Sequence, residues 1–214
     1  MKIFSQDKEC FCKVCFCKIS RNNFYSFMTK NLYLCDDCKD KISAKFTYFD
    51  VEGYRAMAIF NYDSELKQLI YQFKGCFDIE LKDVFLERYS REIALIYKGF
   101  VVIPAPSYEE ENKAREFNHV IEVFSRLNLP MNCCVKKVSP FKQAEHKSKD
   151  RSEISKHLEI FNGESLTNKK VLLVDDVYTT GSTIRAMINL IKPFKPKKIK
   201  ILVISKTVLK PVDT

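Results

Sequence analysis

The sequence predicts an α/β protein with a mostly parallel sheet and a small N-terminal metal-binding unit. Three observations support this prediction. Strand-like apolar segments alternate with amphipathic segments between residues 54 and 204, which is the pattern of a parallel sheet connected by helices. Near the C-terminus, one such strand runs into two adjacent acids and a turn of small hydroxylated residues. Two Cys-x-x-Cys pairs lie within the first 38 residues.

The cysteine pairs have the spacing of a zinc ribbon. Cys12 and Cys15 form the first pair, Cys35 and Cys38 form the second, and 19 residues separate them. Each pair can make a tight turn that offers two thiolates, and four thiolates fill a tetrahedral Zn²⁺ site without an open position for catalysis. We therefore expect a structural zinc in a ribbon of residues 1–45, with the metal supplying most of its folding energy.

Other roles for the cysteines stay open at this point. Cys10 and Cys17 flank the first pair at single-residue spacing; they are either spare thiols or, for Cys17, the main rival for a ligand position. An iron–sulfur cluster is an alternative occupant of a four-cysteine site. Cys76, Cys133 and Cys134 fit the role of small buried hydrophobic residues.

The first half of the larger domain, residues 46–214, begins with a strand and two helices. Residues 54–62 are aromatic and apolar, which is typical of a strand. Residues 64–73 and 81–96 carry apolar side chains at i, i+3, i+4 and i+7, which predicts amphipathic helices. Residues 99–103 form a short apolar run that two prolines end, so we expect a second strand there.

The second half continues the alternation. Apolar residues on one face predict a helix over 113–127, and a strand over 133–138 ends at Ser139 and Pro140. We expect a mobile basic loop after it, up to Lys156. The remaining elements are a strand of four apolar residues at 171–174, an amphipathic segment at 184–191 and a strand at 199–204.

The strand at 171–174 leads into the most informative motif of the chain. Asp175 and Asp176 follow it, and Thr179, Thr180, Gly181, Ser182 and Thr183 form the next turn. A tight turn at a helix start presents free backbone N–H groups and the positive helix end to an anion. Paired carboxylates suit a ribose diol or a divalent cation. Together, the acids and the turn predict a sugar-phosphate site at the carboxyl end of the sheet.

This motif resembles the phosphoribosyl-diphosphate (PRPP) motif of type I phosphoribosyltransferases. The resemblance implies that Asp175 and Asp176 bind the ribose, with Mg²⁺ as a bridge to the pyrophosphate, and that residues 179–183 bind the 5′-phosphate. A strand-end loop that includes Ser107 resembles the family's pyrophosphate loop. Basic residues of a flexible loop complete such sites, and here these would be Lys142, Lys147 and Arg151.

The order of segments further resembles the ComF family of late-competence proteins, which join a four-cysteine zinc finger to a phosphoribosyltransferase-like domain. The matching stretches are Tyr62–Lys74, Ile103–Pro106, Arg115–His119, the Lys142-Gln143 pair with Arg151, and the PRPP motif. Two positions depart from the family pattern: Glu116 replaces a glycine and His119 replaces a glutamine. His119 is expected to be a surface or packing residue of its helix.

The resemblance implies a cytoplasmic protein that binds PRPP and handles single-stranded DNA during natural transformation. A formal charge of +9 agrees with an anionic partner, and no apolar run reaches the roughly 20 residues of a membrane span. Two alternatives remain: an active phosphoribosyltransferase with an unknown acceptor, and an adaptor whose ribbon docks on a competence helicase or membrane channel at the inner face of the cytoplasmic membrane.

Overall fold

A five-stranded sheet forms the centre of the protein, for which a computed structural model describes residues 10–19, 33–138 and 158–207. Four of its strands are parallel neighbours and the fifth adds an antiparallel edge. The mostly parallel α/β fold predicted from the alternation is therefore confirmed. In spatial order the strands are β1 (Thr47–Val51), β2 (Tyr54–Asn61), β7 (Lys198–Lys206), β6 (Lys170–Tyr178) and β3 (Phe100–Pro104).

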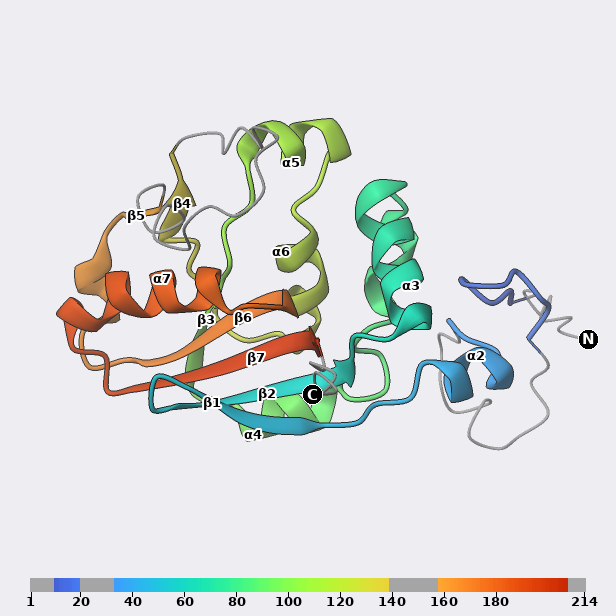
Figure 1. Ribbon diagram of the computed structural model, residues 1–214, viewed down its shortest axis with the longest axis horizontal. Coiled ribbons are helices and arrows are strands. Elements are labelled where there is room, and N and C mark those ends of the chain that lie inside the picture. The colour runs from blue at the N-terminus through green and yellow to red at the C-terminus, as the bar shows by residue number, and fades with distance from the viewer. Residues whose placement is uncertain (1–9, 20–32, 139–157, 208–214) are drawn as a thin grey trace, which may run out of the picture.

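Helices cover both faces of this sheet (Figure 1). The helix on one face buries an apolar stripe against alternate residues of the central strands, including Leu173 and Val203. On the opposite face, Leu172 and Leu202 belong to a hydrophobic cluster with a second group of helices. The same cluster includes Cys12 and Cys38 of the cysteine unit, which we define as the described residues 10–19 and 33–45. The first layer is α7 (Ser182–Ile191); the second contains α3 (Ser64–Gly75), η1 (Ile79–Asp83), α4 (Ser90–Ile96), α6 (His119–Phe124) and η2 (Ser125–Leu127).

The edge strand β1 was not predicted from the sequence. It pairs with β2 through a two-residue turn in which both Glu52 and Gly53 have positive φ values, of 52° and 84°. Positive φ at both positions gives the turn a twist that matches paired antiparallel strands. The Asp50 carboxylate accepts a hydrogen bond of 2.7 Å from the Gly53 N–H and closes the turn.

Two predicted helices are each divided in the structure. The segment 81–96 contains the end of η1, a series of turns and then α4, and Val84, Phe85 and Leu86 are buried in succession along the turns. The segment 113–127 is divided by Glu116, whose φ of 65° ends α5 (Glu109–Arg115). Asn118 then caps α6 by accepting hydrogen bonds from the backbone of Val120 and Ile121.

The remaining elements frame the main sheet. The strand expected at 133–138 is β4 (Val135–Lys137), which pairs with β5 (Leu158–Ile160) in a separate antiparallel sheet next to α7. Among the described residues, no helix is long and apolar enough to cross a membrane. The other short elements are α2 (Asp36–Lys41), η4 (Gly163–Leu166) and η5 (Lys192–Phe194).

Candidate functional site

A cavity of about 200 Å³ opens at the carboxyl ends of β3 and β6. This is the edge at which parallel sheets bind their ligands. The structure brings both predicted acids together here with Ser107 and Thr183, which come from two other predicted segments. The cavity is lined by Lys74, Ala105, Pro106, Ser107, Glu111, His119, Val120, Lys137, Asp175, Asp176, Val177 and Thr183.

The two acids are part of strand β6, which continues past the predicted strand end to Tyr178. The Asp175 carboxylate accepts a hydrogen bond of 2.9 Å from the Asp176 N–H, and the Asp176 carboxylate accepts one of 2.7 Å from the Val177 N–H. Asp176 also binds the ammonium group of Lys74, with 2.5 Å between Lys74 Nζ and Asp176 Oδ2. Helix α3 therefore places an ammonium group against one of the two carboxylates.

The environment drives the pKa values of the two carboxyl groups apart. Burial, followed by the negative charge of Asp176, raises the pKa of Asp175 well above its ordinary value. Burial also opposes ionisation of Asp176, but a hydrogen bond from His119 and the charge of Lys74 outweigh it and lower the pKa of Asp176. Asp176 is thus the ionised member of the pair, and Asp175 is the one that an added cation would help to ionise.

His119 is a member of this charge network, which the sequence did not indicate. Its Nε2 atom lies 3.4 Å from Asp176 Oδ2, and its Nδ1 atom lies 3.4 Å from a guanidinium nitrogen of Arg115. Arg115 in turn donates to the Lys74 carbonyl at 3.1 Å and pairs with Glu111 at 2.8 Å. The sequence predicted that His119 is either a surface residue or a packing residue of its helix. It is 5% exposed and is therefore a packing residue.

The pKa of His119 predicts how stability depends on pH. Burial lowers this pKa below its ordinary value near 6.5, despite the neighbouring Asp176. As the pH falls below about 6.5, the unfolded chain takes up a proton at His119 before the folded protein does, and stability is lost. In His119→Gln, urea unfolding should show a shallower loss between pH 7 and pH 5, by up to about 1.4 kcal/mol per pH unit. Equal slopes for both proteins between pH 7 and pH 5 would contradict this account. Above pH 7, where His119 is neutral in both states, the two slopes should be the same.

The loop after β3 is fixed by polar contacts around Ser107. The Ser107 hydroxyl donates to the Asn112 side chain at 2.7 Å and accepts from the Asn118 amide at 3.0 Å. Asn118 thus caps helix α6 and holds the loop at the same time. Ser107 lies in the cavity wall as predicted, but its hydroxyl already has protein partners.

The turn at 179–183 depends on its glycine. Gly181 has a φ of 74°, and a Cβ atom there would lie 2.3 Å from the Tyr178 hydroxyl oxygen, so a larger residue would strain the backbone and displace the Tyr178 ring. The Thr180 carbonyl accepts from Arg185 at 2.7 Å, and the Thr180 hydroxyl donates to Ser182 at 3.1 Å. Thr179 and Thr180 are exposed, while Thr183 faces the cavity that contains the acids.

Lys137 is a second cavity residue that the sequence analysis missed. It stands at the end of β4, where burial lowers its pKa, and its Nζ atom lies 4.3 Å from the centre of the Tyr108 ring. The available signal was its position immediately before the basic loop. The cations predicted in that loop, Lys142, Lys147 and Arg151, lie outside the described residues.

The four predicted cysteine ligands converge at the other end of the chain. The Sγ atoms of Cys12, Cys15, Cys35 and Cys38 all lie within 4.8 Å of one another, and those of Cys15 and Cys35 are 3.6 Å apart. Tetrahedral Zn²⁺ with Zn–S bonds near 2.3 Å requires sulfur separations of about 3.8 Å. The cluster is therefore compatible with structural zinc.

Cys17 lies beside this cluster without belonging to it. Hydrogen bonds from the backbone and the thiol of Cys17 lower the pKa of Cys15 to about 6, which favours the thiolate that a metal ligand must be. Hydrogen bonds with the thiols of Cys15 and Cys35 raise the pKa of Cys17. Among the described residues the converging Sγ atoms are those of the four predicted cysteines and do not include that of Cys17, so the geometry favours the predicted ligands over this rival.

The cysteine unit packs against the larger domain. Cys12, Leu34 and Cys38 are buried in the same hydrophobic cluster as helix α3 and η1. Lys13 pairs with Glu80. The Arg126 guanidinium lies 5.3 Å from the centre of the Tyr33 ring, a cation–π contact that joins the unit to η2.

Comparisons with known proteins find one matching family model and several similar proteins. The family model for the phosphoribosyl transferase domain matches residues 119–209, which include α6, both acids and the turn. Two solved structures are similar at low identity: a hypoxanthine phosphoribosyltransferase from Staphylococcus aureus (14% identity over 62% of this chain and 75% of that one, TM-score 0.39) and a hypoxanthine-guanine phosphoribosyltransferase from Bacillus anthracis (15% over 64% and 76%, TM-score 0.41).

Two curated relatives extend the similarity beyond this domain. Competence protein ComFC of Streptococcus pneumoniae is 28% identical over 92% of this chain and 88% of its own length. Competence protein ComFC of Bacillus subtilis is 26% identical over 59% of this chain, and the match spans only about half (53%) of that relative. The sheet and the matched domain define a phosphoribosyltransferase-like protein. With the four-cysteine cluster added, the chain is similar to the ComFC competence proteins over most of its length, as the resemblance to the ComF family predicted.

Proposed function

We propose that the protein binds PRPP together with Mg²⁺ at the carboxyl end of β6. The observation that supports this most directly is that Asp175, Asp176, Ser107 and Thr183, from three segments, surround one cavity. In this proposal the acids bind the ribose hydroxyls and residues 179–183 bind the 5′-phosphate. Carboxylate oxygens are the donors that Mg²⁺ prefers, so the residues present fit that cation.

The cations around the cavity suit the pyrophosphate. Lys74 and Lys137 both line it, and we assign them to the same task as Ser107, Lys142, Lys147 and Arg151. Lys74 neutralises Asp176 in the structure. With Asp175 and Asp176 holding Mg²⁺, the Lys74 ammonium would be available to a phosphate oxygen in the same cavity.

We further propose that the protein is a cytoplasmic factor that handles single-stranded DNA during natural transformation. Both curated relatives are competence proteins, and the net charge of +9 suits a polyanionic partner. In this proposal residues 1–45 bind one structural Zn²⁺, residues 46–214 bind PRPP, and a competence helicase or channel at the inner membrane face is a further partner.

A ligand panel tests the PRPP assignment. Thermal unfolding is measured with PRPP, ribose 5-phosphate, pyrophosphate and ATP, each with and without Mg²⁺. A ligand at about 100 times its Kd stabilises the folded state by about 2.7 kcal/mol, so PRPP with Mg²⁺ should give the largest shift. No shift with PRPP would refute the assignment. Release of pyrophosphate when nucleobases or amines are added would establish the alternative, an active phosphoribosyltransferase.

A further inference from the structure

Positive side chains gather on one face of the sheet, at the amino ends of its parallel strands and thus away from the acids. Strand pairing sets Lys170 directly opposite Lys198, and the register of β2 and β7 sets Arg55 beside Lys200. Like charges opposite one another destabilise a sheet. A bound anion would remove that repulsion.

Few acids balance this group. Asp50 pairs with Arg55 in register and Glu92 lies on α4, but the sequence from Lys192 to Lys206 contains six lysines and no acid. Burial, followed by the charges of Lys198 and Arg55, lowers the pKa of Lys200.

Aromatic rings lie close to the ammonium groups of two of these lysines. The Nζ atoms of Lys170 and Lys200 lie 5.9 and 5.7 Å from the centre of the Phe100 ring, and Lys200 lies 5.4 Å from that of Tyr97. Next to them is a hollow of about 530 Å³ with an apolar floor and a cationic rim. Its volume lies in the usual range for a site that holds a small organic group. Tyr48, which is 64% exposed, lies at its edge on strand β1.

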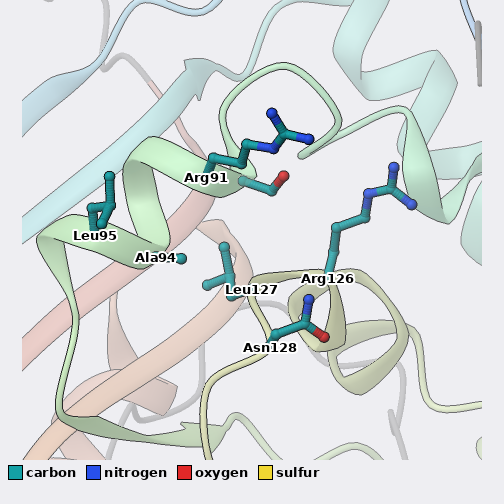
Figure 2. A pocket seen from close by; sticks show the side chains of 7 residues that line it. Arg91, Ala94, Leu95, Arg126, Leu127 and Asn128 are labelled. Carbon is teal, nitrogen blue, oxygen red and sulfur yellow. The ribbon is translucent and has the colours of Figure 1, made fainter. Parts of the chain in front are cut away.

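A second hollow, of about 660 Å³, lies on the other side of helix α4. Figure 2 shows Arg91 and Arg126 extending toward the same side of it, from α4 and from η2. Arg126 also pairs with Asp83 and contacts Tyr33 of the cysteine unit. Leu95 of α4, which is 73% exposed, belongs to this hollow, and its neighbour Ile96 belongs to the first. Helix α4 is therefore an apolar ridge between two hollows, each bordered by two cations.

We propose that this α4 surface, defined as the two hollows and the ridge between them, binds single-stranded nucleic acid. Bases would stack on Tyr48 and on the apolar ridge, while Arg55, Lys198, Lys200 and Arg91 contact phosphates. Stacking on aromatic side chains requires bases that are free of a duplex, which selects single strands. The inference rests on the DNA-handling part of the proposed function and adds the location of the contact, separate from the PRPP cavity.

Fluorescence anisotropy with a labelled oligothymidylate tests the surface, using the full chain at several salt concentrations. The double variant Arg55→Gln/Lys200→Gln removes two cations, and Lys67→Gln/Lys113→Gln removes two from exposed helix positions as the control. Each phosphate contact on a single strand contributes about −0.7 to the slope of log K against log salt, so only the first variant should flatten that slope, by about 1.4. Tyr48→Ala should weaken binding roughly tenfold and Tyr48→Phe should not, because the ring is what stacks.

The outcomes separate the inference from the proposed function. Loss of binding in the double variant and in Tyr48→Ala, with the control unchanged, supports the α4 surface. The wild type, Tyr48→Ala and the double variant could all bind the oligonucleotide with the same affinity. That result would overturn the inference and leave the proposal of DNA handling intact. If the wild type does not bind, both fail. If the same variants no longer bind phosphatidylglycerol vesicles but still bind the oligonucleotide, the surface is a membrane contact and the inference is wrong. Tyr48 is an exposed edge-strand residue, so its variants test the surface even if the double variant unfolds.

Discussion

Replacing Asp175 or Asp176 by asparagine should weaken PRPP binding in each case, but the two variants should differ in the stability of the protein without ligand. A carboxylate in a charge-assisted contact contributes about 1.5–3 kcal/mol, so each single variant should lose about 10- to 100-fold in affinity. The double variant should show no PRPP binding by isothermal titration calorimetry in Mg²⁺. Neither change should alter the metal content of the cysteine cluster, which lies in another part of the structure.

The difference between the two variants follows from their contacts. Asp175 receives one backbone hydrogen bond, which an asparagine oxygen can also accept, and its charge is disfavoured by burial and by Asp176. Asp175→Asn should therefore leave stability unchanged or raise it. Asp176 neutralises Lys74, so Asp176→Asn leaves that ammonium without its partner and should cost about 1–2 kcal/mol.

Urea unfolding of the two variants checks this order, and Glu159→Gln, an exposed acid on β5, serves as the matched control. Asp175→Asn less stable than Asp176→Asn would mean that the charge distribution of the pair has been assigned the wrong way round. Retained PRPP affinity in the double variant would exclude these carboxylates from the site.

Local patterns were sufficient for much of the fold. The strand of β6, the acids and the turn could be predicted because one short segment contains the buried run, the charges and the required glycine. Helix α3 could be predicted for the same reason: its apolar face repeats every three to four residues and Asp63 caps its start. Such features depend on residues that are close in sequence.

The sequence-based predictions were wrong or incomplete where contacts between distant residues determine the structure. Glu116 adopts a left-handed conformation that is costly for a residue with a side chain, in agreement with the family's use of glycine at this position. Periodicity alone could not reveal that break, although Asn118 was a usable helix-start signal. His119 joins the site through Asp176, 57 positions further along the chain, and Lys137 packs over Tyr108, 29 positions before it; no local pattern predicts such contacts.

Replacing Cys35 and Cys38 by serine should release one zinc ion per chain and destabilise the domain that the cysteine unit contacts. The metal supplies most of the order of such a small unit. When it is lost, Cys12, Leu34 and Cys38 leave the cluster that they share with α3 and η1. We expect a loss of about 2–4 kcal/mol, from the removal of two or three buried side chains, and a fall in the unfolding temperature of about 5–15 °C.

Zinc content by mass spectrometry and thermal unfolding test this expectation together. The control is Cys76→Ser/Cys133→Ser. Both thiols are exposed, so the expectation of burial was wrong for them and right only for Cys134, and their removal should retain the metal. Cys17→Ser should also retain it, because Cys17 is not one of the four converging thiols. Unchanged zinc in the Cys35 and Cys38 variant would mean that other ligands bind the ion. Lost zinc with an unchanged unfolding temperature would mean that the cysteine unit folds independently, and that its contacts with α3 and η1 add no stability.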